Sequence, residues 1–148
     1  MEPITVRNWM TPNPITIPMD TLMTKAYRMM VDHKFRHLPI INPATNKVVG
    51  VVSKQQIRRV EIHLLTLYAR SMMSSLVMQF DTVGEMPLPQ LVTVGPNDTM
   101  EQASLLMSLH QLSALAVVAD DQLVGILTES DVYRFVQEVY DGPSRRAE

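Results

Sequence analysis

The chain has 148 residues, of which 46% are hydrophobic and 19% are charged, a composition typical of a globular protein with a substantial core. Because its net charge is −2 and its longest apolar run, 114–119, is far shorter than a membrane helix, neither a nucleic acid nor a membrane is expected as a partner. Residues 1–10 lack the features of a signal peptide, so we expect a cytoplasmic protein. The absence of cysteine excludes disulfides and thiolate chemistry but does not indicate a compartment.

The chain contains an internal repeat. A shift of 77 residues aligns six pairs of identical residues, namely Thr16 and Thr93, Met23 and Met100, Ala26 and Ala103, Met30 and Met107, His33 and His110, and Leu38 and Leu115. After the loop 42–46 the shift becomes 75, which aligns Gly50 with Gly125. One copy of about 55 to 60 residues buries little surface by itself, so we expect two copies to share a core and to leave a ligand cleft between them.

The first repeat reads as strand, helix, strand, strand, helix. The expected elements, in chain order, are a strand at 15–17, a helix from Thr21 to about Asp32, strands at 38–41 and 48–52, and a helix that starts after Ser53. Asp20 is expected to cap the first of these helices because its side chain can accept a hydrogen bond from a free backbone N–H.

The segment between the repeats, 60–80, contains neither glycine nor proline and is apolar on more than one face. We therefore expect it to continue the helix that starts after Ser53. This segment either covers an exposed flank of the core or forms part of a dimer contact. The twelve methionines indicate adaptable filling of the core rather than a metal or redox role.

The second repeat follows the same order. Its expected elements are a strand at 91–94, a helix from about Asp98 to Leu109, strands at 115–119 and 123–127, and a helix from Glu129 to about Tyr140. Asn97 or Asp98 is expected to cap the first of these helices. Alternating strands and helices of this kind predict α/β or α+β packing.

The segment 125–131 is the best candidate for ligand chemistry. A strand ends at Thr128 and a helix begins, so free N–H groups, the positive end of the helix dipole and the Thr128 hydroxyl suit a phosphate. Asp131 lies one turn further on and could accept hydrogen bonds from both hydroxyls of a ribose. The alternative is purely structural, because Thr128 with Asp131 is close to a capping box, as is Ser53 with Gln56.

Three motifs in order carry a family resemblance: the opening 9–17, the strand 36–40 with its Arg-His-Leu-Pro-Ile sequence, and Gly-x-x-Thr-x-x-Asp at 125–131. They resemble the cystathionine β-synthase (CBS) domain, and the duplication is similar to a stand-alone CBS pair, or Bateman module. The resemblance implies an α+β fold of two β-α-β-β-α repeats packed with pseudo-two-fold symmetry. It places repeat 1 at 4–60, a helical linker at 61–80, repeat 2 at 81–140 and a disordered tail at 141–148.

The resemblance also implies a non-catalytic, regulatory, energy-sensing function. Members of the family bind adenosine-containing ligands such as AMP, ADP, ATP, S-adenosylmethionine or NAD in two clefts between the repeats, and they commonly form two-fold dimers. The expected partners are thus an adenine nucleotide, a second copy of the chain and an unidentified effector protein. The alternative is a structural or dimerisation module that has lost its ligand.

Each cleft in the family combines residues from both repeats. Carried onto this sequence, the stronger site comprises Thr128, Asp131, Ile126, Met10, Thr11, Ile15, Arg36, His37 and Pro39. The weaker site comprises Ser53, Gln56, Lys54, Val92, Leu112, Ser113, Ala114 and Ala116. In the weaker site Gln56 replaces the ribose-binding carboxylate and Ala116 replaces the usual proline, although Lys54 still favours phosphate. We therefore predict one good site and one weak or empty site.

An enzymatic function has little support in the sequence. The four histidines, His33, His37, His63 and His110, show no metal-binding spacing, and neither a Gly-x-Ser-x-Gly motif nor a Walker loop is present. We accordingly expect no catalytic residue, no catalytic cofactor and no metal.

Overall fold

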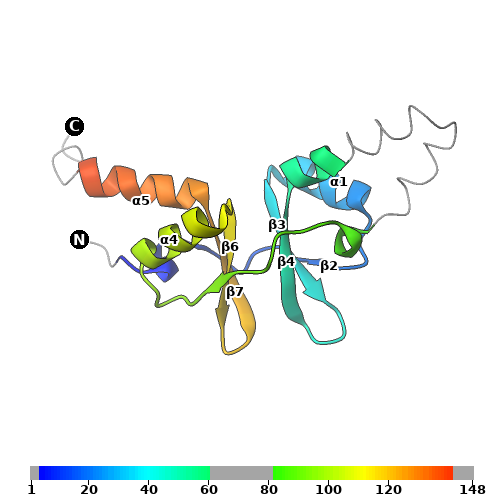
Figure 1. Ribbon diagram of the computed structural model, residues 1–148, viewed down its shortest axis with the longest axis horizontal. Helices are drawn as coiled ribbons and strands as arrows, with labels where there is room; N and C mark the ends of the chain where they lie inside the picture. Colours follow the sequence, from blue (N-terminus) through cyan, green and yellow to red (C-terminus); the bar gives the residue numbers. More distant parts are fainter. Residues whose placement is uncertain (1–3, 61–81, 142–148) are drawn as a thin grey trace, which may run out of the picture. The chain divides into compact units, whose positions relative to one another are not determined.

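The computed structural model describes residues 4–60 and 82–141, which form two compact units (Figure 1). Among the described residues, unit 1 comprises residues 4–14 and 92–141, and unit 2 comprises residues 15–60 and 82–91. Each unit thus joins the body of one repeat to the segment that precedes the other repeat. The linker expected at 61–80, with its possible dimer contact, and the tail beyond Asp141 lie outside the described residues.

Unit 2 contains a three-stranded mixed sheet in the order β2-β3-β4. Strand β2 (Ile17–Pro18) is parallel to β3 (His37–Asn42), which is antiparallel to β4 (Lys47–Ser53). Helix α1 (Met23–His33) and the helical residues 54–60 bury apolar side chains in the same cluster as the sheet. That cluster includes Met23, Met30 and Met86, so methionines do fill the core here.

Unit 1 contains a four-stranded mixed sheet in the order β1-β7-β6-β5. The strands are β1 (Thr11–Pro12), β5 (Thr93–Val94), β6 (Ala114–Ala119) and β7 (Gln122–Thr128). Helices α4 (Met100–His110) and α5 (Glu129–Asp141) pack beside each other on one face of this sheet (Figure 1). The expected mixed α/β fold with two repeats is confirmed.

The two units repeat each other in detail. The register of β3 against β4 shifts between Ile40 and Ile41, and that of β6 against β7 shifts between Val117 and Val118, 77 residues later. Helices α1 and α4 both end in a left-handed residue, Lys34 and Gln111 respectively. A bulge changes the direction of a strand, and a left-handed C-cap residue ends a helix. Both features recur at equivalent positions, as expected for a duplicated chain.

The segment that precedes each repeat, which we call its leading segment, completes the hydrophobic core of one unit. The 3-10 helix η1 (Val6–Asn8) precedes repeat 1 but packs in unit 1, where Val6 N–H donates to the Asp98 carbonyl at 2.8 Å. The 3-10 helix η2 (Val83–Glu85) precedes repeat 2 but packs in unit 2, where Val83 N–H donates to the Thr21 carbonyl at 2.8 Å. Val6 and Val83 are both fully buried, so each core is completed by the leading segment of the other repeat.

Two predicted helix caps were wrong. Leu22 is the N-cap of α1, and its apolar side chain makes no cap hydrogen bond, whereas Asp20 lies in the preceding turn. Thr99, not Asn97 or Asp98, caps α4 and forms a capping box with Gln102. The Asp98 carboxylate instead accepts the N–H of Gly95 at 2.7 Å and closes the turn before the helix.

The outer strands are shorter than expected. Strand β2 begins at Ile17 rather than Ile15, and β5 begins at Thr93 rather than Leu91. Ile15 is 41% exposed, so its apolar side chain does not mark a core-facing position. Helix α5 matches its predicted bounds within one residue at its C-terminus.

Gly125 lies where the leading segment crosses β7, which predicts the cost of adding a side chain there. A Cβ at this position would lie 2.5 Å from the Met10 sulfur and 3.0 Å from the Thr11 carbonyl oxygen. Gly125→Ala should therefore lower the free energy of unfolding by about 1–3 kcal/mol, because the contact includes backbone. Urea denaturation measures this change.

Gly95→Ala is the matched control for that measurement. Its Cβ would meet no atom closer than 3.5 Å, which is ordinary van der Waals contact. The control should change stability far less than Gly125→Ala, and equal losses in the two variants would contradict the packing of the leading segment on β7.

Candidate functional site

Asp131 lies at the junction between β7 and α5 and is only 6% exposed. Its Oδ2 atom accepts hydrogen bonds from the Thr128 N–H at 2.8 Å and from the Thr128 hydroxyl at 3.1 Å. The carboxylate therefore stabilises the N-terminus of α5, where negative charge also complements the helix dipole. The capping arrangement proposed from the sequence is present.

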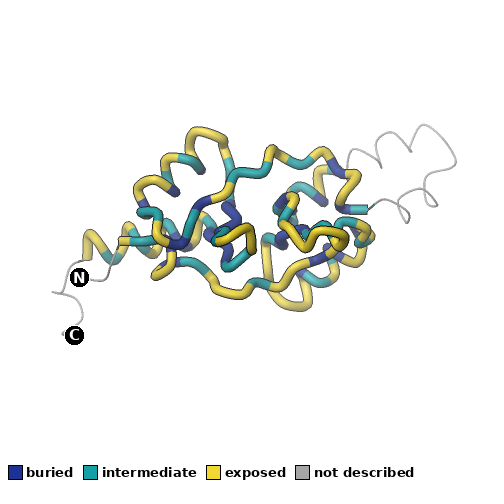
Figure 2. The backbone as a smooth tube through the Cα atoms, turned by 90° about the horizontal axis from the view of Figure 1, so that it is seen from below, coloured by how far each residue is buried: buried dark blue, intermediate teal, exposed yellow. Residues whose placement is uncertain are grey.

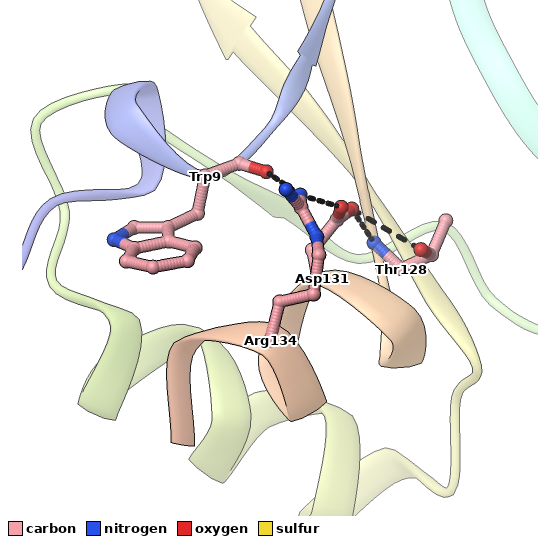
Figure 3. Close-up of polar contacts among 4 residues, drawn as sticks. All are labelled: Trp9, Thr128, Asp131 and Arg134. Carbon is pink, nitrogen blue, oxygen red and sulfur yellow. Dashed lines mark hydrogen bonds and ion pairs between the residues drawn. The ribbon is translucent and has the colours of Figure 1, made fainter. Parts of the chain in front are cut away.

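Arg134 holds the other oxygen of the same carboxylate. Its Nη2 atom lies 2.6 Å from Asp131 Oδ1 and also donates to the Trp9 carbonyl oxygen at 3.2 Å (Figure 3). The guanidinium carbon lies 5.8 Å from the centroid of the Trp9 ring, within the range of a cation–π contact. Arg134 thus ties the leading segment to α5 through the charge of Asp131.

This network changes what Asp131 and Thr128 can offer a ligand. A carboxylate has about four acceptor positions, and Thr128 and Arg134 occupy three of them. The Thr128 hydroxyl donates its hydrogen bond to Asp131 in this structure, so the phosphate contact suggested for it from the sequence stays a prediction. The sequence reasoning missed Arg134 and Trp9, although the spacing of Asp131 and Arg134 by three residues on a helix was a usable signal.

The corresponding junction in unit 2 lies between β4 and the helical residues 54–60. It is capped by uncharged side chains, whereas the junction between β7 and α5 is capped by a carboxylate. The Ser53 N–H donates to Gln56 Oε1 at 2.8 Å, and the Gln56 N–H donates to the Ser53 hydroxyl at 3.1 Å. This is the capping box that the sequence proposed. Gln56 therefore occupies the place of Asp131 without its charge.

Cationic side chains accompany this second junction. The Lys54 ammonium lies 5.6 Å from the centroid of the Tyr27 ring, and Arg58 Nε donates to the Tyr27 hydroxyl at 3.1 Å. The Lys54 N–H donates to the Arg36 carbonyl at 2.9 Å, which brings Arg36 beside the start of the helix. The unit 2 junction thus combines a neutral cap with positive charge.

The structure places the predicted site residues in two groups. Met10, Thr11, Ile126, Thr128 and Asp131 of the stronger set belong to unit 1, where Thr11 pairs with Ile126 between β1 and β7. The other members of that set, which belong to unit 2, are Ile15, Arg36, His37 and Pro39.

The weaker set divides in the same way. Ser53, Lys54 and Gln56 belong to unit 2, where Ser53 pairs with His37 between β4 and β3. Its members in unit 1 are Val92, Leu112, Ser113, Ala114 and Ala116. Two of these, Val92 and Leu112, pack against the hydrophobic core. Because each predicted site draws on both units, the two composite sites stay predictions.

His37 lies on β3 next to Arg36, at the start of the strand. The pKa of His37 is lowered from its ordinary value, mainly because the side chain is buried and also because the positive charge of Arg36 lies nearby. The imidazole is accordingly neutral at neutral pH, so the permanent positive charge at this end of the strand comes from Arg36.

Within residues 4–60 and 82–141, no group of three or more histidine, aspartate or glutamate side chains could hold a metal ion. In the same residues no helix is both long enough and apolar enough to span a membrane.

The CBS-domain family model matches residues 6–63 and 83–138. The chain therefore belongs to the CBS-domain family and contains two CBS domains that form a CBS pair. This agrees with the matching strand registers of the two units and with the capped strand-to-helix junction that each of them contains.

Relatives of known structure include CBSX2 from Arabidopsis thaliana, which is 26% identical over 95% of this chain and 99% of that chain, with a TM-score of 0.73. A structure of CBSX2 in complex with AMP is 27% identical over 93% of this chain and 99% of that chain, with a TM-score of 0.72. The CBS pair of MJ0100, solved with 5′-methylthioadenosine and S-adenosyl-L-methionine, shares the fold at 23% identity over 90% of this chain and 97% of that chain, with a TM-score of 0.69.

Curated relatives include enzymes that contain CBS domains. A homoserine O-acetyltransferase from Methanocorpusculum labreanum is 27% identical over 86% of this chain. The match covers 23% of the length of that enzyme. The chain spans about a quarter to a half of the length of the first curated relatives that it matches.

The lowered pKa of His37 predicts a pH dependence of stability. In the unfolded chain His37 binds its proton near the ordinary pKa of 6.5, whereas the folded protein takes it up only at lower pH. The unfolded state thus binds more protons in this window, so the free energy of unfolding should fall as the pH is lowered below about 6.5. Urea denaturation at about pH 7.5 and pH 5.5 measures the loss.

His37→Gln is the control for the pH experiment. This variant removes the titrating group, so its stability should fall less between the two pH values than that of the parent protein. Identical pH profiles for the two proteins would show that His37 does not contribute.

Proposed function

We propose that the chain is a non-catalytic regulatory module that binds an adenosine-containing ligand, AMP, ADP, ATP or S-adenosylmethionine. The observation that supports this most directly is the buried Asp131 carboxylate at the start of α5 in a chain similar to CBSX2, which has been crystallised with AMP. Asp131 would accept hydrogen bonds from the ribose hydroxyls, sharing Oδ1 with Arg134.

In this proposal the phosphate is bound by other groups than the Thr128 hydroxyl. The N-terminal end of α5 offers backbone N–H groups and a positive dipole end, and Arg36 of unit 2 offers a guanidinium that can bind two phosphate oxygens. Met10, Thr11, Ile15, His37, Pro39 and Ile126 would provide the walls. Glu129 opposes excess negative charge near the same helix start, which favours a ligand with few phosphates.

The weaker site follows from the neutral junction of unit 2. A ribose hydroxyl bound by the Gln56 amide lacks the charge-assisted hydrogen bond of a carboxylate, a difference of roughly 1 kcal/mol. Lys54 would still attract phosphate. We therefore propose unequal affinities, with the Asp131 site filled first.

Regulation would work by a shift of populations. A ligand held by residues of both units binds some relative orientations of the units better than others, so its binding biases that orientation. The output would then pass to an effector protein or to a second copy of the chain. No catalytic step is part of this proposal, and the activities of the CBS-containing enzymes are not transferred to this chain.

A ligand-free interaction module is the second candidate, and one observation favours it. Thr128 and Arg134 already engage both oxygens of Asp131, so the carboxylate is satisfied without a ligand. Isothermal titration calorimetry with AMP, ATP and S-adenosylmethionine separates the two candidates, because the interaction module should bind none of them.

Asp131→Asn tests the ribose contact while keeping an acceptor for the Thr128 N–H. Replacing the charged acceptor with an amide should weaken AMP binding by about fivefold to tenfold. Calorimetry measures the affinity, and thermal unfolding monitors the fold. Full affinity in a folded Asp131→Asn protein would contradict the role given to Asp131.

Gln56→Asp is the converse variant in the other repeat. It introduces the missing carboxylate at the junction of unit 2, so it should raise the affinity of the weaker site. If the variant instead changes the affinity of the stronger site, the two junctions have been assigned to the wrong sites.

Arg36→Ala tests the phosphate contact. Because adenosine has no phosphate, the variant should weaken ATP binding by about tenfold or more and leave adenosine binding nearly unchanged. Parallel calorimetric titrations with the two ligands measure the difference. Equal losses for both ligands would mean that Arg36 does not contact phosphate.

A further inference from the structure

Within unit 1, one nitrogen atom of Arg134 bridges two parts of the chain that lie 125 residues apart. Its Nη2 atom donates to Asp131 Oδ1 at 2.6 Å and to the Trp9 carbonyl oxygen at 3.2 Å. Asp131 and Arg134 belong to α5, whereas Trp9 belongs to the leading segment of the first repeat. A change at the Asp131 carboxylate therefore reaches Trp9 through a single side chain.

The two partners of this ion pair differ in how freely they can move. Asp131 is the only buried residue among the thirteen of α5, and its side chain is 8% exposed, whereas the side chain of Arg134 is 61% exposed. Figure 2 shows this helix coloured mainly as exposed and intermediate. Because a guanidinium at the surface regains water when it leaves its partner, Arg134 can move at a much smaller cost than the buried carboxylate.

A ligand with two neighbouring hydroxyls would compete with Arg134 for Asp131. The N–H and the hydroxyl of Thr128 occupy two acceptor positions on Oδ2, and Arg134 occupies one on Oδ1, so one of about four positions is free. The two hydroxyls of a ribose need two positions. Of the three donors now present, Arg134 has the most exposed side chain, so we expect its contact to weaken when the second hydroxyl binds.

Trp9 is packed in a way that makes it sensitive to this contact. Its ring is 7% exposed and meets Phe135 of α5 edge to face, with 5.3 Å between the ring centroids. Among the buried side-chain nitrogen and oxygen atoms of residues 4–60 and 82–141, Trp9 Nε1 alone lacks a hydrogen-bond partner. An unpaired buried N–H offsets part of the free energy gained by burying the ring, so the contact with Arg134 matters more for holding Trp9 in place.

Backbone hydrogen bonds hold the leading segment on both sides of Trp9. The Arg7 N–H donates to the Pro96 carbonyl at 2.8 Å, and the Asn13 N–H donates to the Val124 carbonyl at 3.1 Å. These contacts do not involve Arg134, so they remain when Arg134 moves. The expected change is therefore a local loosening of Trp9 rather than a release of the whole segment.

The internal repeat provides a comparison. The positions that correspond to Asp131 and Arg134, 75 residues earlier, are Gln56 and Arg59, and the position that corresponds to Trp9, 77 residues later, is Met86. The arginine is thus retained in unit 2, but a neutral amide cannot form an ion pair with it. Arg59 therefore serves as a matched control for Arg134.

We propose that Arg134 couples the Asp131 site to the leading segment, so that a bound ribose weakens the Asp131–Arg134 ion pair and loosens Trp9. Because coupling between two equilibria is reciprocal, Arg134 in turn lowers the affinity of the site for its ligand. This inference rests on the proposed function, since it requires a nucleotide at Asp131. It goes beyond that function, because the signal reaches the leading segment within unit 1 and does not require a change in the relative orientation of the units.

Fluorescence quenching of Trp9 tests the coupling, because Trp9 is the single tryptophan of the chain. Saturation of the parent protein with AMP should raise the acrylamide quenching constant, since a loosened ring is more accessible to the quencher. The control ligand is 2′-deoxy-AMP, which keeps only the 3′-hydroxyl of the pair. This single hydroxyl fits the free position on Asp131, so 2′-deoxy-AMP at saturation should leave the quenching constant nearly unchanged.

Arg134→Met removes the competing charge and both of its hydrogen bonds. Trp9 should then be quenched more strongly without AMP, AMP should add no further change, and the affinity for AMP should rise by about threefold or more. A gain in affinity separates the coupling from a merely structural role, because damage to the fold would lower the affinity. Calorimetry measures the affinity, and thermal unfolding monitors the fold.

Two further variants complete this experiment. Arg134→Lys keeps the positive charge beside Asp131, so its affinity for AMP should return toward that of the parent protein. Arg59→Met, the control in unit 2, should change neither the affinity of the Asp131 site nor the quenching of Trp9.

Failure of the coupling and failure of the proposed function give different results. If calorimetry detects no binding of AMP to the parent protein or to Arg134→Met, the proposed function is wrong and this inference is wrong with it. If AMP binds but the quenching of Trp9 stays constant, the ribose is accommodated without Arg134, for example by rotation of the Thr128 hydroxyl, and only the coupling is wrong. A loss of affinity in a folded Arg134→Met protein would also overturn the coupling, because Arg134 would then support the ligand instead of competing with it.

Discussion

The structure depends on the two segments that precede the repeats, because each of them packs into the core formed by the other repeat. Val6, which precedes the first repeat, is buried in the core of unit 1, and Val83, which precedes the second, is buried in the core of unit 2. Strand β1 adds to this by pairing with β7, more than 100 residues away. Neither repeat therefore completes its core with its own contiguous sequence, and the free energy of folding of one unit includes contacts from the flank of the other repeat.

Asp131 joins this exchange to the candidate ligand site. Its carboxylate caps α5 and holds Arg134, whose guanidinium also contacts the Trp9 carbonyl of the leading segment. In the proposed complex a ribose would share Oδ1 with Arg134 and so affect the Asp131–Arg134 ion pair. This ion pair holds the leading segment through the contact of Arg134 with Trp9. The same carboxylate thus has a structural role in capping α5 and a proposed role in binding the ligand, and a bound ribose would share Oδ1 with Arg134.

Duplication followed by divergence accounts for the differences between the units. The bulges, the left-handed helix ends and the strand-to-helix junctions are alike, whereas the charges at the junctions and on the helix surfaces differ. Gln56 stands where Asp131 stands in the other unit, and Arg28 stands where Leu105 stands. The backbone devices are retained because the fold needs them, while side chains on the surface are free to take on separate functions.

The sequence by itself determined the duplication, the order of strands and helices and the cap at Ser53 and Gln56, because periodicity and capping are signals that act within a few residues. It also singled out Asp131 and Thr128 as a possible helix cap, and the structure contains this cap. The tertiary structure decided that residues 6–12 belong with the second repeat, that Thr99 rather than Asp98 caps α4, and that Arg134 occupies Asp131 while holding Trp9, 125 residues away. These outcomes rest on which segments share a core and on competition among nearby polar groups for the same hydrogen bonds, and local sequence patterns do not encode either.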